Sequence, residues 1–537
     1  MNKQLNFNHL IITIFIIYFL IGLAIFDDYS VTPDEELHRI NGLISLKYVF
    51  NLFSINLFES TELLNAPNLY EDWRKTYGVI FDLPIAFLQV WQKINNQDIF
   101  LIRHFLNFII FFFGCIYFFR LINENLLDKK IALFGTIILF TTPRIFSHSF
   151  YNSKDIIFLS LIIIAVFYCI KLLQKNNFKS FILAGLFCAL ATNIRVIGIY
   201  LPILTFIFYF FKEEKNKNVN NLKFFVILFF IYFTFVYLLW PFLWEDPFKN
   251  FFLILKESAT YPNHWKFNIL YLGEYLNPEH IPWHYFFIWF SFTTPFIYLI
   301  FIILGFFLFI KNYLHSFLII NFKKNIYLWQ NNKQMVNLFI FLNFFIFIFF
   351  IICLNSTLYN GWRHLFFLYP FLIYLSLYGI LFFKNKVKIY NLIISLLIFQ
   401  TLTNVYFIYK SHPIQNVYFN IFANKIIEGK MPIDYWGLGN KKTIDHVLVN
   451  NKKISISTSS FTPLNYLEFS DYNNLYSKEV IFSGTNIQSK LNSDFIFTNY
   501  YYDKNPTNIE KYSIPINYKS YYKLIINDII VNELFTK

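Results

Sequence analysis

The chain has 537 residues, of which 56% are hydrophobic and only 14% are charged, and its mean hydropathy is +0.46. Ordinary soluble domains carry about 25% charged residues, so this composition excludes that class and indicates a polytopic membrane protein. The net charge of +13 does not indicate a nucleic-acid partner, because the lysines gather in short loops between apolar segments or scatter through the C-terminal region without forming a basic stripe.

Apolar segments long enough to cross a hydrocarbon core of about 30 Å follow one another as far as residue 410. The first has no small-residue cleavage site after it, so we interpret it as a retained signal anchor. The segment 181–211 is too long for one helix, and two short passes that meet near Asn193 and Arg195 fit its length better. The sequence therefore predicts about eleven transmembrane helices, at 9–26, 100–121, 131–147, 156–173, 181–211 (two), 223–241, 285–310, 337–354, 364–383 and 388–409.

The lysine-rich loops fall on one side of this arrangement, and the positive-inside rule makes that side cytoplasmic. The N-terminus is then expected in the cytoplasm and the C-terminal region outside. Segment 79–92 is short and contains Asp82 and Pro84, so we expect a helix at the membrane interface; a span there would reverse the sidedness of everything after it. The lysines that define the inner side are Lys129, Lys130, Lys171, Lys175, Lys179, Lys212, Lys215, Lys217, Lys311, Lys323, Lys324, Lys333, Lys384, Lys386 and Lys388.

The first outer loop, 27–99, opens with five carboxylates close to the end of the first span. A solvated helix end is served by any polar residue and favours Lys, Trp or Tyr, so these acids are candidates for function. Solvation of the helix end explains Asp27 and Asp28 better than chemistry does, which leaves Asp34, Glu35 and Glu36.

Arginine is rare, since only seven of the 45 basic residues are arginine, and six of the seven fall on or near the predicted outer face. The guanidinium fork binds phosphate or carboxylate through two parallel hydrogen bonds. Arg195 lies within an apolar run, where an unpaired charge costs about 3 kcal/mol or more, so it should face a polar cavity. Because separate outer segments each carry an arginine, the sequence predicts that three of them converge on a site for an anionic substrate. The alternative is that each arginine forms an ion pair with a carboxylate. The arginines are Arg39, Arg74, Arg103, Arg120, Arg144, Arg195 and Arg363, and the carboxylates considered are Asp34, Glu35, Asp155 and Glu245.

The chain changes character near Ser411, where long apolar runs give way to Asn, Lys and Tyr and to short strand-like pieces at 453–457, 479–482 and 494–498. We expect a transmembrane domain over 1–410 and a small soluble α/β domain over 411–537. Accessory acceptor recognition and a purely structural cap are both open as roles for the second domain.

The sequence contains five motifs with a defined order and sidedness, at 32–38, 143–155, 184–198, 293–295 and 361–370. Together they cover most of residues 1–410. They resemble those of the GT-C glycosyltransferases, in particular the branch of the protein O-mannosyltransferases and aminoarabinose transferases. The resemblance implies an α-helical polytopic membrane protein of GT-C type with a small extracytoplasmic C-terminal α/β domain, and the expected location is a bacterial inner or plasma membrane.

The resemblance implies transfer of a sugar from a polyprenyl-phosphate-linked donor to a hydroxyl of a lipid, glycan or protein acceptor at the outer face. It implies a carboxylate of the first outer loop as general base, and Asp34 matches that position. Such a displacement needs a base for the acceptor proton and cations for the departing phosphate, and a single displacement would invert the anomeric centre. We assign Glu35 as a neighbour of the base or an acceptor-orienting group, Arg195 and Arg363 as phosphate clamps, and Arg39, Arg144, Asp155 and His364 as further substrate-binding residues.

A metal requirement is left open. Asp155 matches the position where some members of the family hold a second acid near a divalent metal, but no clear paired acid accompanies it in this sequence. A zinc site of His264, His280 and His284 is the other candidate; histidines of a proline-rich loop without cysteines are more often interfacial hydrogen-bonding groups. No cofactor is assigned.

The main alternative function is a transporter or flippase of an anionic lipid-linked sugar, which would also use arginines in a cavity. A carrier predicts internal pseudo-symmetry and discontinuous helices in matching halves, and the sequence indicates neither. An assembly scaffold without catalysis is the third reading, and it leaves Asp34 and Arg195 unexplained.

Overall fold

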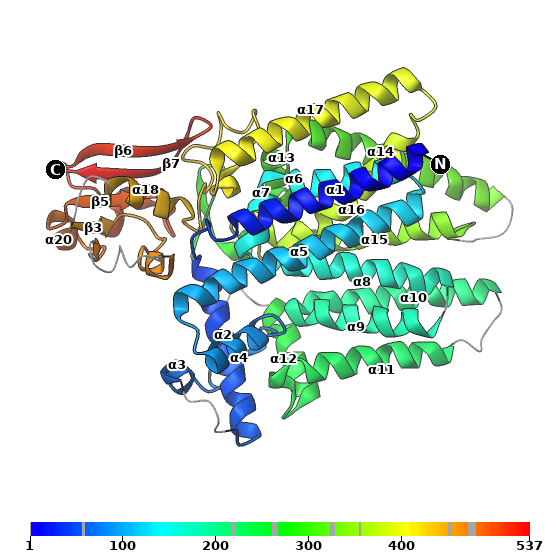
Figure 1. Ribbon diagram of the computed structural model, residues 1–537, viewed down its shortest axis with the longest axis horizontal. Helices are drawn as coiled ribbons and strands as arrows, with labels where there is room; N and C mark the ends of the chain where they lie inside the picture. Colours follow the sequence, from blue (N-terminus) through cyan, green and yellow to red (C-terminus); the bar gives the residue numbers. More distant parts are fainter. Residues whose placement is uncertain are drawn as a thin grey trace.

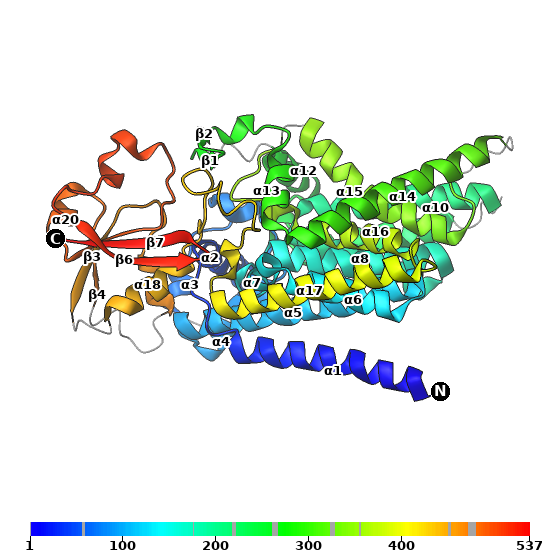
Figure 2. The same ribbon diagram turned by 90° about the horizontal axis from the view of Figure 1, so that it is seen from above.

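The computed structural model describes residues 2–55, 60–175, 177–216, 222–259, 267–322, 328–353, 356–448, 453–470 and 480–537. The long helices lie side by side along the longest dimension of the molecule (Figure 1). The N-terminus lies at one end of this bundle, and a small C-terminal sheet lies beyond the opposite end (Figures 1 and 2).

Seven helices of the described chain are long and apolar enough to cross a membrane, and a bent pair adds an eighth candidate. Three further apolar helices are shorter. This confirms a polytopic, mostly helical membrane protein, whereas the count of eleven spans stays a prediction. The seven are α1 (Asn2–Ile25), α5 (Asn96–Leu126), α8 (Asp155–Lys175), α14 (Phe296–Phe322), α15 (Asn332–Cys353), η7 with α16 (Arg363–Leu368, Tyr369–Leu381) and α17 (Val387–Ser411); the bent pair is α6 (Lys129–Thr141) with α7 (Pro143–Tyr151), and the shorter helices are α9 (Phe178–Ile194), α10 (Tyr200–Asn216) and α11 (Leu222–Leu238).

Several helices are interrupted at the end of the bundle that faces the sheet. The predicted break near Arg195 is confirmed, since α9 ends at Ile194 and a 3₁₀ turn, η2 (Val196–Ile199), leads into α10. The expectation of continuous helices elsewhere was wrong. The α6–α7 pair bends by 67° at Pro143, and the predicted span 285–310 is divided at Pro295 into α13 (Tyr285–Thr293) and α14. Proline lacks the amide hydrogen and disfavours helical backbone in the residue before it, so it ends the preceding helix in both cases.

Contacts between lysine-bearing loops tie together the end of the bundle that holds the N-terminus. Lys384 lies 2.7 Å from the carboxylate of Asp128, which also caps the start of α6. Lys129 donates to Asn8 near the start of α1 at 2.9 Å, and Lys171 pairs with Glu124. These loops therefore share one side, as the lysine pattern predicts.

The first outer loop folds into helices that lie across the other end of the bundle (Figure 1). Segment 79–92 forms the helix α4, whose 11 residues reach only about 16 Å and cannot span a bilayer. It packs along α2 so closely that a side chain at Gly42 would meet the carbonyl of Asp82. The outer elements are α2 (Pro33–Leu52), α3 (Thr61–Asn65), η1 (Trp73–Thr76), α4 (Asp82–Gln92), η4 (Pro241–Leu243), α12 (Pro247–Ala259), β1 (Ile269–Tyr271), β2 (Glu274–Leu276) and η6 (Pro278–His280).

The C-terminal sheet has five strands in the order β4-β3-β5-β7-β6. The first three are parallel, and β7 pairs antiparallel with both β5 and β6. The three predicted strands are confirmed as β3, β4 and β5, whereas the final hairpin of β6 and β7 was not predicted. The elements are α18 (Gly439–Leu448), β3 (Ile454–Thr458), η9 (Asn465–Ser470), β4 (Val480–Phe482), α20 (Ile487–Leu491), β5 (Phe495–Thr498), η10 (Pro506–Asn508), η11 (Glu510–Tyr512), β6 (Lys519–Ile526) and β7 (Ile529–Thr536).

The segment 412–438, which contains the short helix η8 (Gln415–Val417), connects α17 to this sheet and packs on the helical bundle. Its apolar side chains belong to the same hydrophobic cluster as the transmembrane helices, whereas the inner side chains of the sheet and α18 form a second, smaller cluster. The first part of the C-terminal region is therefore continuous in packing with the bundle.

Candidate active site

The N-terminus of α2 fixes the position of Asp34. Thr32 and Glu35 form a capping box, in which the Thr32 amide donates to the Glu35 carboxylate at 2.9 Å. Pro33 occupies the first helical position, where its missing amide hydrogen costs nothing. Asp34 follows in the first turn, with its carboxylate about one-third exposed.

The Asp34 carboxylate is linked through arginine to two other outer segments. Arg363 Nη1 lies 3.2 Å from Asp34 Oδ2 and 3.2 Å from Asp155 Oδ2, so one nitrogen bridges two carboxylates. Arg195 pairs with the other oxygen of Asp155. Asn152 donates to Asp155 Oδ2 at 2.9 Å and fixes it further. Asp34, Asp155, Arg195 and Arg363 form one group, which we call the ion-pair cluster.

The two arginines of the ion-pair cluster retain hydrogen-bond donors. The Nε atoms of Arg195 and Arg363 are buried and have no hydrogen-bond partner within the described chain. The Arg195 side chain is 29% exposed, whereas Arg363 is buried. Buried donors are normally satisfied, so an unpaired guanidinium edge next to a partly open position indicates a place where an anion would bind. Arg195 and Arg363 also form ion pairs with carboxylates, which is the alternative role that the sequence allowed for the arginines.

Burial has the largest effect on Asp34 and raises the pKa of its carboxyl above the ordinary value of 3.8, while Arg363 opposes that shift and Asp155 adds to it. A carboxylate with a raised pKa accepts a proton more readily than an ordinary aspartate. Asp34 is therefore suited to act as a base in its ionised form.

The surroundings of Asp155 do not fit a divalent metal. Its two oxygens contact Arg195, Arg363 and Asn152, so two guanidinium groups occupy the positions that a cation would need. Across the described ranges, no three or more His, Cys, Asp or Glu side chains are grouped to hold a metal ion. His284 contacts the hydroxyl of Tyr271 at 2.7 Å, and His264 lies outside the described residues.

Other predicted site residues lie apart from the ion-pair cluster or contact different groups. Arg39 is held by Glu36 at 2.6 Å and by Glu62 at 2.9 Å. Glu35 is the capping residue, and its second oxygen lies 2.8 Å from His104. Both carboxylate oxygens of Glu35 are thus engaged away from Asp34.

Arg144 is buried beside the tail segment. Its Nε donates to the carbonyl of Tyr418 at 2.9 Å, and its guanidinium lies over the ring of Phe419. One Nη is buried without a hydrogen-bond partner. His364 follows Arg363 and packs against Tyr359. Both residues line the same region as the ion-pair cluster without joining it.

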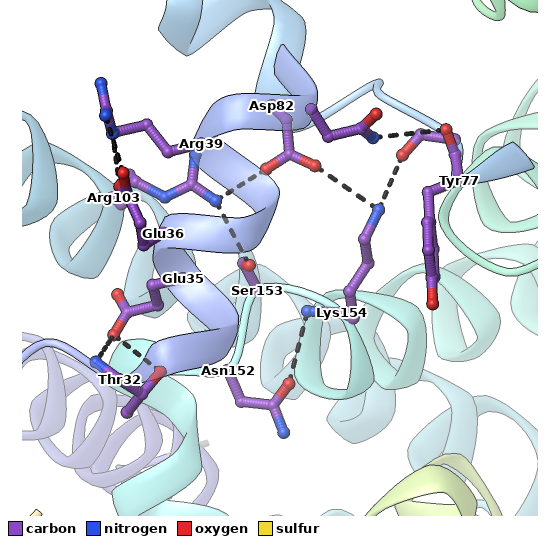
Figure 3. A network of polar contacts seen from close by, with 12 residues as sticks. Thr32, Glu35, Glu36, Arg39, Tyr77, Asp82, Arg103, Asn152, Ser153 and Lys154 are labelled. Carbon is purple, nitrogen blue, oxygen red and sulfur yellow. Dashed lines mark hydrogen bonds and ion pairs between the residues drawn. The ribbon is translucent and has the colours of Figure 1, made fainter. Parts of the chain in front are cut away.

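Figure 3 shows a second buried charged group, which was not predicted from the sequence. It includes Lys154, which directly precedes Asp155 of the ion-pair cluster and interacts electrostatically with Arg195. Asp82 of α4 contacts Arg103 of α5 at 2.7 Å and Lys154 at 3.4 Å. Burial has the largest single effect on the pKa of the Asp82 carboxyl and acts to raise it. Lys154 and Arg103 together outweigh burial, so the pKa of Asp82 lies below its ordinary value. The signals that could have found this group are a carboxylate that interrupts the apolar segment 79–92 and an arginine within the span 100–121.

Because Asp82 is the partner of two buried cations, we expect Asp82→Asn to destabilise the fold. The cost is about 3 kcal/mol, because the substitution leaves Lys154 and Arg103 buried without a carboxylate. Thermal unfolding of the full-length protein in detergent measures it as a lower Tm. Asp27→Asn is the matched control, because Asp27 is exposed, and equal Tm values for the two variants would contradict the assignment.

Comparison with known proteins matches one part of the chain to a family. Residues 84–240 match the family described as dolichyl-phosphate-mannose-protein mannosyltransferase. This stretch holds Arg103, Arg144, Asp155 and Arg195, and it ends before Arg363. No curated protein sequence matches the chain. Among solved structures, the crystal structure of ArnT from Cupriavidus metallidurans bound to undecaprenyl phosphate is similar over 99% of this chain and 98% of that one, at 11% sequence identity and a TM-score of 0.44.

Proposed function

We propose that this chain is a GT-C membrane glycosyltransferase of the branch that includes the protein O-mannosyltransferases and aminoarabinose transferases, and that it is an inverting enzyme. The match of residues 84–240 to the mannosyltransferase family supports this proposal. It moves a hexosyl or pentosyl group from a polyprenyl-phosphate donor to an acceptor hydroxyl. The lysine pattern supports the outer face of the membrane for this reaction, with the N-terminus in the cytoplasm. We place the enzyme in a bacterial inner or plasma membrane. The acceptor is a lipid, a glycan or a protein.

The observation that carries this proposal is the single Arg363 nitrogen that lies 3.2 Å from both Asp34 and Asp155. A sugar transfer from a lipid phosphate needs a base and a cation within a few ångströms of each other, because the proton leaves the acceptor while charge grows on the phosphate. Asp34 and Arg363 meet that requirement. Asp155 pairs with both arginines and so holds them in position.

The proposed reaction is one displacement at the anomeric carbon. The acceptor oxygen forms a bond to that carbon, and Asp34 takes the hydroxyl proton. The bond between the anomeric carbon and the phosphate oxygen breaks, and its electron pair leaves with the polyprenyl phosphate. Arg195 and Arg363 donate hydrogen bonds to the phosphate oxygens as their charge grows. Attack from the side opposite the phosphate inverts the anomeric centre.

The raised pKa of Asp34 predicts a pH dependence. The base is the ionised carboxylate, so transfer should be constant well above its pKa and fall about tenfold per pH unit below it. Since the pKa is raised, the acid limb of kcat/KM should lie at higher pH than an unperturbed aspartate would give. A profile of kcat/KM that stays flat down to pH 4 would contradict the role of Asp34 as base.

A transporter of the same lipid-linked sugar is the second candidate, and the broken helices support it. The bend of 67° between α6 and α7 and the division of α13 from α14 are the kind of discontinuity that carriers use around a substrate site. A carrier must also open its site to both sides of the membrane, whereas Asp34 and its arginine partner belong to the outer end of the bundle (Figure 1).

Transfer of label to an acceptor tests the proposal. Purified protein is incubated in detergent with a panel of radiolabelled polyprenyl-phosphate sugars and membrane lipid, glycan and protein fractions. We expect one donor to label one acceptor fraction, and nuclear magnetic resonance of the product to show the inverted anomer. Label that stays on the polyprenyl lipid with every donor would contradict a glycosyltransferase.

A further inference from the structure

The tail segment 412–438 and the sheet after it touch the candidate active site at several points. Four consecutive residues that lead into α2 are each bonded to the C-terminal region. Asp28 contacts His412 at 2.7 Å, Tyr29 donates to Gln415 at 3.0 Å, Ser30 donates to the carbonyl of Leu438 at 3.1 Å, and the amide of Val31 donates to Ser470 at 2.8 Å. The segment that carries Asp34 into position is therefore held by the C-terminal region.

The loop before Arg363 is held in the same way. Asn360 and Gly361 both have positive φ angles, 53° and 81°, so the backbone makes a tight turn there. Tyr501, which follows β5, donates its hydroxyl to Asn360 Oδ1 at 2.9 Å. The sheet thus fixes the turn that delivers Arg363 to the ion-pair cluster.

A turn at 434–439, at the end of the tail segment, lies next to Arg363. The buried Asp434 carboxylate accepts from the amides of Leu438 and Gly439, at 3.1 and 2.7 Å, and from Asn416 at 2.9 Å. Gly437 has a φ of +72°, and a side chain there would lie 2.5 Å from Asn440. Glycine and the aspartate together define this turn.

The defined turn presents Trp436 to Arg363. The Arg363 guanidinium carbon lies 4.8 Å from the centre of the Trp436 ring. Trp436 is buried, and the rings of His148 and Tyr151 pack against it with ring centres 5.1 and 5.4 Å away. A guanidinium over an aromatic ring interacts with it through its charge, so its N–H groups stay free to reach Asp34, Asp155 and an incoming anion.

We propose that Trp436 is a positioning residue for the reaction: it holds the plane of the Arg363 guanidinium in the orientation that binds the phosphate of the donor. This inference rests on the proposed function for its substrate class. It also gives the C-terminal region a role that the sequence left open, because that region completes the site through Trp436.

Binding of a polyprenyl phosphate tests this inference without requiring transfer. Equilibrium binding of a radiolabelled polyprenyl phosphate to the full-length protein in detergent is compared for wild type, Trp436→Ala and Trp436→Phe. We expect Trp436→Ala to raise the Kd about tenfold, the loss of one buried cation–π contact, and Trp436→Phe to stay within about threefold because it keeps a ring. Trp283→Ala, at an exposed tryptophan just before α13, should bind as wild type does.

Repeating the Trp436→Ala substitution in the Arg363→Lys protein separates an effect on the Arg363 guanidinium from a general loss of protein stability. Lysine at 363 keeps the charge but has no planar group for the ring to orient, so Trp436→Ala should change the Kd of Arg363→Lys by less than about twofold. A tenfold effect in both backgrounds, or none in wild type, would overturn the inference. If the wild type binds polyprenyl phosphate but transfers no sugar, the proposed function fails and the positioning role is still decided. If the wild type binds no polyprenyl phosphate, both fail.

Discussion

Asp34→Asn is expected to lower the rate of sugar transfer on the order of 10³-fold, the contribution typical of a general base. The amide has the shape of the carboxylate but cannot take the acceptor proton. The capping box of Thr32 and Glu35 does not involve the Asp34 side chain, so α2 should keep its start and the protein its Tm. Donor binding should persist, because Arg195 and Arg363 keep their contacts with Asp155.

Steady-state transfer and donor binding of the two proteins check this expectation. Asp27→Asn is the control, because it removes an exposed carboxylate a few residues before α2 and should leave both quantities unchanged. A transfer rate for Asp34→Asn within threefold of wild type would remove Asp34 from the mechanism.

Arg363→Ala is expected to lose donor binding as well as transfer, with kcat/KM falling about 100-fold or more, the size of effect seen when one preorganised donor to a developing anion is removed. Two causes add. The phosphate loses a guanidinium contact, and the carboxylates of Asp34 and Asp155 lose the cation that they share. Arg363→Lys should fall between wild type and Arg363→Ala, because lysine restores the charge without the fork.

The matched control for this substitution is Arg120→Ala. Arg120 belongs to α5 and lies near its lysine-rich end, where its side chain is 44% exposed and interacts with Glu124. Its loss should leave donor affinity unchanged. Equal donor affinity in Arg363→Ala and wild type would show that the phosphate does not bind at the ion-pair cluster.

Much of the membrane architecture could be predicted, because span length and lysine distribution are properties of single segments. Lys129, Lys171 and Lys384 lie at one end of the bundle as expected. The breaks at Pro143 and Pro295 were missed, although a Thr-Thr pair followed by proline is the signal for both. The hairpin of β6 and β7 turns at Asn527 and Asp528, both with positive φ, a residue pair typical of such turns.

The candidate site was predictable only in part. Asp34, Asp155, Arg195 and Arg363 could be named, since charges near apolar segments are few, and the structure brings these four together. The pairing of Arg39 with Glu36 and Glu62 could not be predicted. Several acids lie close to Arg39 in the sequence, and the sequence does not indicate which of them it contacts. Contacts of Trp436 and Tyr501 with the site span 73 and 141 residues of sequence, and only the folded chain reveals them.

Simultaneous measurement of transfer and translocation in proteoliposomes tests the central claim most directly. Wild type and Asp34→Asn are reconstituted with the radiolabelled polyprenyl-phosphate sugar identified in detergent, together with its acceptor. The account predicts label in the acceptor with wild type alone, and no protein-dependent movement of labelled lipid between leaflets with either protein. Label that crosses the bilayer equally with both proteins, and reaches no acceptor, would contradict the account and make the chain a transporter.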